Sequence, residues 1–411
     1  MDWAATREQF PTLDHEIFLN AADQMAPGRY WIDGFRDCLT LYEAGRISDE
    51  PPYGPATHPF LTTAFEECIE LGADLIGADP AEVTNMYRPM TAMNLVLTDL
   101  LDWADGDNVV FTDLAYPSLP YILFHLRDAY GVELRRVENV DGEIRLADLA
   151  DAIDDDTKAV CLNRTTAWCG FTHDVEAICD LAHDHDAYVL DDAMQSVGAM
   201  EVDVHADDVD FLVTGSYKWQ AGPEGAGIFY VREDLIEAFE PDFRNYLWAD
   251  LPTEIPFGFP DHDNVEHWDY PLVADANRFE QGICVTPVLF GWRETLEYLH
   301  DLGPAAIEAR VTDLGGYLID RLDEIGCEVV TPRDPERRHG LVVYTTGDDA
   351  VDEATYERFS APEPGTKPIN VTYRSLGGVG GVRVSCHFFN TRDDVDELVA
   401  RQERILNDLA G

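Results

Sequence analysis

The sequence predicts an α/β protein built on a mainly parallel sheet with helices on both faces. Between about residues 80 and 235, short apolar runs rich in β-branched residues alternate with longer amphipathic segments. Such runs are typical of strands buried on both faces of a parallel sheet, and the alternation places helices between them. The candidate strands are 108–113, 158–163, 187–192 and 209–215, and the candidate helices are 91–106 and 174–186.

The chain changes character after this alternating region. Residues 226–231 (AGIFYV) follow the last strand closely enough to pair with it in antiparallel orientation. Residues 240–277 are rich in proline, glycine and aromatic residues, which indicates an ordered loop, either a lid or a surface excursion. A long helix from about residue 290 leads to strands near CEVVTP, GLVVYTT and GGVRVSCHF and to a closing helix, RDDVDELVARQERILNDLA.

These segments divide the chain into three expected parts. Residues 1–30 form an N-terminal segment that packs on the small domain and the site, 31–290 a large ligand-binding domain, and 291–411 a small C-terminal α+β domain. A chain of 411 residues has room for one large core and a smaller second one.

The charge of the chain narrows the classes of function. There are 80 acidic residues against 28 lysines and arginines, a formal net charge of −52. The acidic residues are spread through apolar segments, so they belong to a folded chain and not to a disordered tail. Such an excess is typical of a halophilic protein, because salt screens the self-repulsion. Nucleic-acid binding is not expected without a basic footprint.

Cysteine spacing and hydropathy indicate a cytoplasmic protein. The eight cysteines show no paired metal-ligand spacing, so we expect reduced, buried thiols and no metal. The first twenty residues lack the basic and apolar pattern of a signal peptide. No run approaches the roughly 18 apolar residues of a membrane span, so no membrane partner is expected.

Candidate site residues follow the predicted strands and one helix start. In open α/β sheets, ligands bind outside the carboxyl ends of the strands. The residues at such ends are Asp191, Asp192 and Gln195 after 187–192, and Ser216, Tyr217 and Lys218 after 209–215. Thr91 and Ala92 open the helix 91–106, where free N–H groups and the helix dipole favour a phosphate.

Lys218 is the most informative of these residues. The chain has only three lysines, Lys158, Lys218 and Lys367, so one kept between two aromatic residues points to chemistry that arginine cannot perform. A desolvated lysine can form a Schiff base with an aldehyde. An aspartate such as Asp192 can keep a pyridine nitrogen protonated, which makes the ring an electron sink. A lysine, an aspartate and a phosphate cradle together suit pyridoxal phosphate.

Two further residues fit the same cofactor. Tyr116 in DLAYPSLPY follows another strand end and can stack on a ring. Arg383 in GGVRVSCHF can hold a substrate carboxylate with paired hydrogen bonds. Taken singly, Tyr116 could be a core residue and Arg383 a structural ion pair; their combination with Lys218 and Asp192 favours a site.

The block YVLDDAMQSVGAMEVDVHADDVDFLVTGSYKWQAGPEGAGIFYVRED resembles the signature of class V aminotransferases and cysteine desulfurase-like enzymes. This family is a branch of the fold type I pyridoxal phosphate proteins. IFLNAADQMAP, RFEQG and VRVSCHFFNTRDDVDELV resemble further family segments, so the likeness covers most of the chain. It implies a fold type I transferase architecture and a homodimer with the active site at the subunit interface.

The resemblance also implies a role for each residue. Lys218 would be the Schiff-base lysine and Asp192 the partner of the pyridine nitrogen, while Asp191 would be a bystander. Gln195 would bind the phenolic oxygen and Tyr116 would stack on the ring. Thr91 and the backbone at Ala92 would hold the phosphate with Ser216 and Tyr217, and Arg383 would bind the substrate α-carboxylate.

The sequence also departs from the family pattern. Cysteine desulfurases need a catalytic cysteine shortly before the C-terminal arginine motif, and this chain has none from 328 to 385, so persulfide formation is not expected. Ala167 stands in place of an asparagine near the phenolic oxygen. Ile283 replaces a threonine that reaches the partner subunit's phosphate, for which Thr286 is the candidate substitute.

These observations predict a pyridoxal phosphate-dependent enzyme that acts on a small amino acid. Transamination and C–S or other β-elimination chemistry are the favoured reactions. Kynureninase-like hydrolysis is an alternative because of AYPS and SYK. A cofactor-binding protein without turnover is the alternative from another class. The amino acid and any acceptor stay open.

Overall fold

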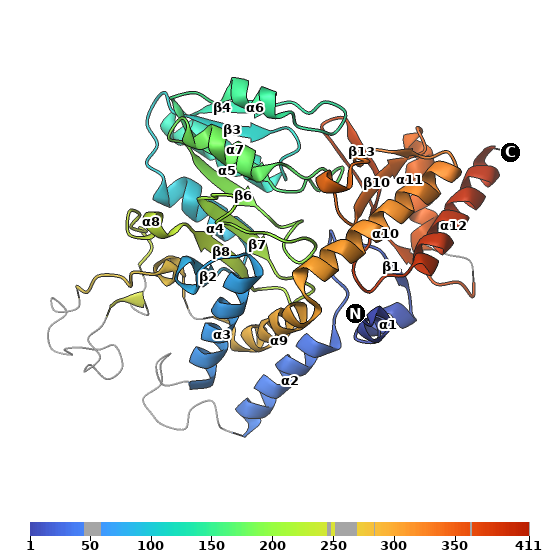
Figure 1. The fold of residues 1–411 in the computed structure, drawn as a ribbon, viewed down its shortest axis with the longest axis horizontal. Coiled ribbons are helices and arrows are strands. Elements are labelled where there is room, and N and C mark those ends of the chain that lie inside the picture. Colours follow the sequence, from blue (N-terminus) through green and yellow to red (C-terminus); the bar gives the residue numbers. More distant parts are fainter. Residues whose placement is uncertain (45–58, 245–247, 251–268, 283, 362–363, 411) are drawn as a thin grey trace.

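The computed structural model describes residues 1–44, 59–244, 248–250, 269–282, 284–361 and 364–410 (Figure 1). At its centre lies a seven-stranded sheet in the order β2-β8-β7-β6-β5-β3-β4. Strands β7, β6, β5, β3 and β4 are parallel, and β8 is antiparallel to both β7 and β2. The strands are β2 (Val83–Asn85), β3 (Asn108–Thr112), β4 (Glu133–Val137), β5 (Thr157–Asn163), β6 (Tyr188–Asp192), β7 (Phe211–Gly215) and β8 (Gly227–Val231). This sheet confirms the predicted fold class.

Helices cover both faces of the sheet, because alternate side chains of each strand point to opposite sides. Val110, Val160 and Val189 share one core with the helices α3, α7 and α9. Val109 and Leu190 share the other core with α4 and α5. These helices are α3 (Pro59–Leu75), α7 (Val175–His183), α9 (Thr286–Leu302), α4 (Pro89–Leu95) and α5 (Ser118–Tyr130).

The structure departs from the sequence-based elements in several places. The strands Val83–Asn85 and Thr372–Leu376 were not predicted, and the helix expected over 91–106 ends at Leu100. Strand β4 was not predicted, because its sequence ELRRV is charged and lacks the apolar run of an inner strand; it lies at the sheet edge, where charge is common. The long helix expected from about residue 290 is two helices, α9 and α10 (Pro304–Glu324). The break is at Gly303, whose φ of +80° is followed by a proline without an N–H group.

The C-terminal region forms a second, antiparallel sheet in the order β12-β13-β10-β9. Its strands are β9 (Glu328–Val329), β10 (Leu341–Thr345), β12 (Thr372–Leu376) and β13 (Val379–Ser385). Helices α10 and α12 (Arg392–Ala410) pack on it in a core of their own. The remaining α-helices are α1 (Trp3–Arg7), α2 (Arg29–Glu43), α6 (Leu146–Ala152), α8 (Glu233–Ile236) and α11 (Asp349–Ser360). No helix in the described ranges combines the length and apolarity that crossing a bilayer requires.

The N-terminal segment connects the two sheets. Strand β1 (Ile17–Phe18) pairs in parallel with β11 (Ile369–Asn370) beside the small sheet, and Asn20 bridges to Ser385 on β13. Five residues later, the Met25 N–H donates to the Tyr217 carbonyl at 2.8 Å, just after β7 of the large sheet. The segment therefore passes the carboxyl ends of the parallel strands.

Candidate active site

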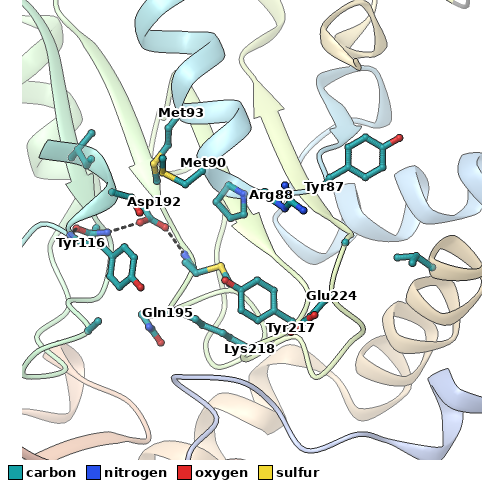
Figure 2. A pocket seen from close by; sticks show the side chains of 18 of the residues that line it. Tyr87, Arg88, Met90, Met93, Tyr116, Asp192, Gln195, Tyr217, Lys218 and Glu224 are labelled. Atoms are coloured by element: carbon teal, nitrogen blue, oxygen red, sulfur yellow. Dashed lines mark hydrogen bonds between the residues drawn. The ribbon is translucent and has the colours of Figure 1, made fainter. Parts of the chain in front are cut away.

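A cavity of about 610 Å3 lies at the carboxyl ends of the parallel strands (Figure 2). Its walls come from the ends of β5, β6 and β7, the start of α4 and α5, and the start of α9. Met90 and Met93 reach into it from α4, while Gln195 and Lys218 lie on the opposite side. The predicted residues that line it are Tyr116, Asp192, Gln195, Tyr217 and Lys218.

Lys218 is buried, with only 8% of its surface exposed. Its Nζ lies 5.5 Å from the centroid of the Tyr116 ring and 6.0 Å from that of Tyr217. Burial, together with the nearby positive charge of Arg383, lowers the pKa of Lys218 to about 8, although Asp192 acts in the opposite direction. The neutral amine is therefore far more accessible near pH 7 than in a surface lysine, as a nucleophile requires.

Asp192 closes β6 with its carboxylate at the cavity wall. One oxygen accepts from Asn163 Nδ2 at 2.6 Å and the other from the Met194 backbone N–H at 3.1 Å. Burial raises its pKa to about 6. Such a carboxylate, held in place by two neutral donors, favours a cationic N–H partner in the cavity.

Asp191 points the other way, because successive side chains of a strand alternate between faces. It is fully buried, and its carboxylate lies 2.7 Å from the Arg164 guanidinium, which also pairs with Asp207. Asp191 is absent from the cavity wall and belongs to a structural ion-pair network.

Three residues predicted to hold a phosphate lie elsewhere. Thr91 faces a separate surface recess beside Asn94, and the Ala92 side chain is buried in the core, while the role expected of the Ala92 backbone stays a prediction. The Ser216 hydroxyl donates to the carbonyl of Pro223. The helix begins at Pro89, two residues before the predicted start, and its side chains at 90 and 93 line the cavity, whereas those at 91 and 92 do not.

Arg88 stands at that wall instead, and sequence reasoning missed it. It is the residue that precedes α4, and it lines the cavity. Arg88 and Lys218 are the two cationic side chains among the described residues that line the cavity. The proline at the first helical position was the available signal, because it marks the preceding residue as the N-cap.

Asn163 was also missed, although it ends the predicted strand 158–163. Besides donating to Asp192, its Oδ1 accepts from the Tyr116 backbone N–H at 3.1 Å. It thereby joins the ends of three strands at the cavity wall. Tyr116 itself is 45% exposed at the mouth, with its ring stacked 6.3 Å from that of Trp168.

Arg383, on β13 of the small sheet, is not among the residues that line the cavity, but it contacts Ala167, which does. Its Nε donates to Thr372 Oγ1 at 3.0 Å and its Nη1 to the Ala167 carbonyl at 3.2 Å. Its Nη2 makes no hydrogen bond in the described structure and lies 3.8 Å from Asp23. Burial lowers the Arg383 pKa to about 10, so the group stays charged at neutral pH. A buried cation with a free N–H beside Lys218 favours an anion.

Some expectations fall on parts of the chain that the structure does not describe. Ile283 and most of the aromatic segment 240–277 lie outside the described residues. Thr286 begins α9, and its neighbours Val285 and Val288 line this chain's own cavity. The domain limits at 30 and 290, the homodimer and the salt-rich cytoplasmic setting stay predictions.

Solved structures share this fold. The apo structure of a cysteine desulfurase from Thermococcus onnurineus NA1 superposes with a TM-score of 0.83 over 98% of each chain, at 23% identity. The complex of the cystine C–S lyase C-DES with its product cysteine persulfide gives a TM-score of 0.81 at 20% identity, covering 96% of this chain and 99% of that one. These likenesses define the class of protein: an α/β fold shared with pyridoxal phosphate enzymes.

Sequence comparison then identifies the family. The model of the aminotransferase class-V family matches residues 57–398. A probable cysteine desulfurase from Halalkalibacterium halodurans is 28% identical over 418 aligned residues, which cover 97% of this chain and 96% of the relative. The chain belongs to the aminotransferase class-V family, and this confirms the expectation of a pyridoxal phosphate-dependent enzyme.

Proposed function

We propose that this protein is a pyridoxal phosphate-dependent C–S lyase, which eliminates sulfur from the β-carbon of a small amino acid and releases it to solution. The observation that carries the proposal is the composition of the cavity. Lys218 and Asp192 line it and the Arg383 charge acts on Lys218 from nearby, yet none of the described residues lining it is a cysteine. All eight cysteines of the chain are buried. No described thiol is therefore placed at this cavity to take sulfur from a substrate as a persulfide.

The residues fit the cofactor and its chemistry. When bound, pyridoxal phosphate supplies an electron sink for the electrons left on the substrate α-carbon. Lys218 would hold the cofactor through Nζ and, once released, take the α-proton as general base. Asp192 would keep a proton on the ring nitrogen, and Gln195 would donate an N–H to an oxygen on the ring. Arg383 would bind the α-carboxylate and so fix which bond at the α-carbon faces Lys218.

The products distinguish this reaction from the alternatives. In elimination, the α-proton and the β-carbon–sulfur bond are both lost, and hydrolysis of the remainder yields a keto acid and ammonia. We expect cystine or cysteine, in molar KCl, to give pyruvate and ammonia in equal amounts with release of sulfide or persulfide. Alanine as the product would indicate desulfuration instead. A keto acid that retains its sulfur, without ammonia, would indicate transamination.

Arg88 is the candidate anchor for the cofactor phosphate. Of the two described cationic side chains that line the cavity, Lys218 is assigned to the cofactor's aldehyde, so Arg88 is the one available to bind the phosphate. Arg88→Ala should lower the affinity of the apo-protein for pyridoxal phosphate about tenfold, since one charge-assisted contact is worth about 1.5 kcal/mol. Equilibrium titration measures this affinity. Arg145→Ala is the matched control, because Arg145 lies on the surface near α6, where it pairs with Asp148. Equal losses in both variants would rule out Arg88 as the anchor.

Arg383→Ala should weaken substrates through their carboxylate. The truncation removes a buried charge-assisted contact, so we expect kcat/KM to fall by at least about 30-fold, roughly 2 kcal/mol. Amino acids should suffer this loss and the corresponding amines, which have no carboxylate, should not. An equal loss for both would mean that Arg383 only supports the fold.

A further inference from the structure

Trp219 follows Lys218 in the chain and is fully buried. Its indole Nε1 donates to Gln195 Oε1 at 2.7 Å. The Nε2 of the same amide donates to the Ala22 carbonyl of the N-terminal segment at 3.1 Å. An amide nitrogen carries two hydrogens, and the amide oxygen is engaged by Trp219. The second N–H of Gln195 is therefore left for the cavity that this residue lines.

The indole itself cannot turn to release the amide. Its ring packs edge-on against the imidazole of His339, with centroids 4.6 Å apart, and also lies against His387. Its backbone carbonyl interacts with His387 Nε2 at 2.8 Å. On the same side, a Cβ built on Gly198 would lie 2.4 Å from that carbonyl, so the backbones are in direct contact. The donor thus has a fixed position relative to Gln195.

We propose that Trp219 is a positioning residue that fixes the Gln195 amide with an N–H, and not its oxygen, toward the cavity. The Gln195 N–H can then donate to an anionic or neutral acceptor oxygen on an aromatic ring. The Asp192 carboxylate, in contrast, can accept a hydrogen bond from a ring N–H. The proposal rests on the proposed function in so far as that ring belongs to pyridoxal phosphate. Trp219 does not touch the cofactor; it acts through Gln195.

A pH titration can measure the effect of Trp219 on Gln195 if the other titratable groups nearby are known. His339 and His387 pack on the indole, and burial lowers their pKa values to about 4 and about 3, so both are neutral near pH 7. On the cavity side, the titratable or charged lining residues are Tyr87, Arg88, Tyr116, Asp192, Tyr217, Lys218 and Glu224, and the charges of Arg383 and Asp23 act on Lys218 from nearby. A substitution at Trp219 replaces none of these side chains.

The test compares two buried tryptophans. Trp219→Phe removes the indole N–H and keeps a ring, and Trp292→Phe is the matched control. Trp292 is equally buried, but its indole donates to Gln220 Oε1 at 3.1 Å. The readout is the pH midpoint of the visible absorption change of the bound cofactor. An N–H donor favours the deprotonated ring oxygen, so W219F should raise the midpoint by roughly 0.5–1 unit, the worth of one hydrogen bond. W292F should leave it unchanged.

A double variant and a conservative one complete the test. Gln195→Ala should give the same upward shift as W219F, and the double variant should add nothing, because both remove one interaction. Trp219→Tyr, which keeps a donor on the ring, should shift the midpoint less than W219F. The proposal is overturned if W219F and W292F shift alike, if W219F leaves the midpoint where it is, or if W219Y and W219F are equal. Absence of any visible band in the unaltered protein would instead refute the proposed function.

Discussion

Lys218→Ala should lower turnover about 10⁴-fold, the upper end of the contribution of a single general base. The variant also loses the only cavity amine among the described residues that can bond to the cofactor's aldehyde. Borohydride reduction of the loaded protein, followed by peptide mass mapping, should place the cofactor on Lys218. In the variant, no peptide should carry it.

Because the chain has only three lysines, the other two can both be tested as controls for Lys218. Lys158 lies 3.7 Å from Asp107 on the surface, and Lys367 donates to the Leu13 carbonyl, both away from the cavity. Lys158→Ala and Lys367→Ala should therefore turn over like the unaltered protein. Cofactor found on either of these lysines, or normal turnover in Lys218→Ala, would contradict the assignment of the nucleophile.

Asp192→Asn should lower kcat about 10²–10³-fold, as expected when one preorganised electrostatic partner is removed. A neutral amide cannot hold a proton on the ring nitrogen, but Lys218 is untouched, so the cofactor should still be trapped by borohydride. Steady-state kinetics and the same peptide mapping measure the two effects separately. Loss of cofactor attachment together with turnover would show that Asp192 serves binding and not chemistry.

The adjacent residue supplies the control for Asp192. Asp191→Asn changes the same chemical group one position earlier on β6, but it breaks the buried pair with Arg164. We expect a loss of roughly 3–5 kcal/mol in the free energy of unfolding, with kcat little changed in the fraction that folds. Reversed behaviour, with kcat lost at Asp191 and stability lost at Asp192, would exchange their roles.

The inner strands could be predicted from sequence because burial on both faces demands apolar residues. β3, β5, β6, β7 and β8 all coincide with predicted runs, within two residues at each end. β4 could not be predicted, since an edge strand has one solvated side and its charged sequence carries no such signal. The break between α9 and α10 could not be predicted from sequence, because the two amphipathic patterns meet without a polar gap. Only the backbone conformation at Gly303 shows where one helix ends and the next begins.

The same distinction explains which site residues were found. Lys218, Asp192 and Gln195 follow strands, and a strand end places its residues at the sheet edge whatever the exact register. Helix residues depend on phase, because each step rotates the side chain by about 100°. The predicted start at 91 therefore selected Thr91 and Ala92, whereas the true start at Pro89 presents Arg88 and Met90.

The path of residues 17–25 has a mechanical consequence. This short stretch is anchored to the small sheet by β1 and Asn20 and to the large sheet by Met25, with the Ala22 carbonyl on Gln195 between the anchors. A rotation of one sheet against the other cannot leave all these bonds intact. Any such movement would pull on the Gln195 amide, which under the proposed function faces the cofactor ring. The electronic environment of that ring would then depend on the relative orientation of the two sheets.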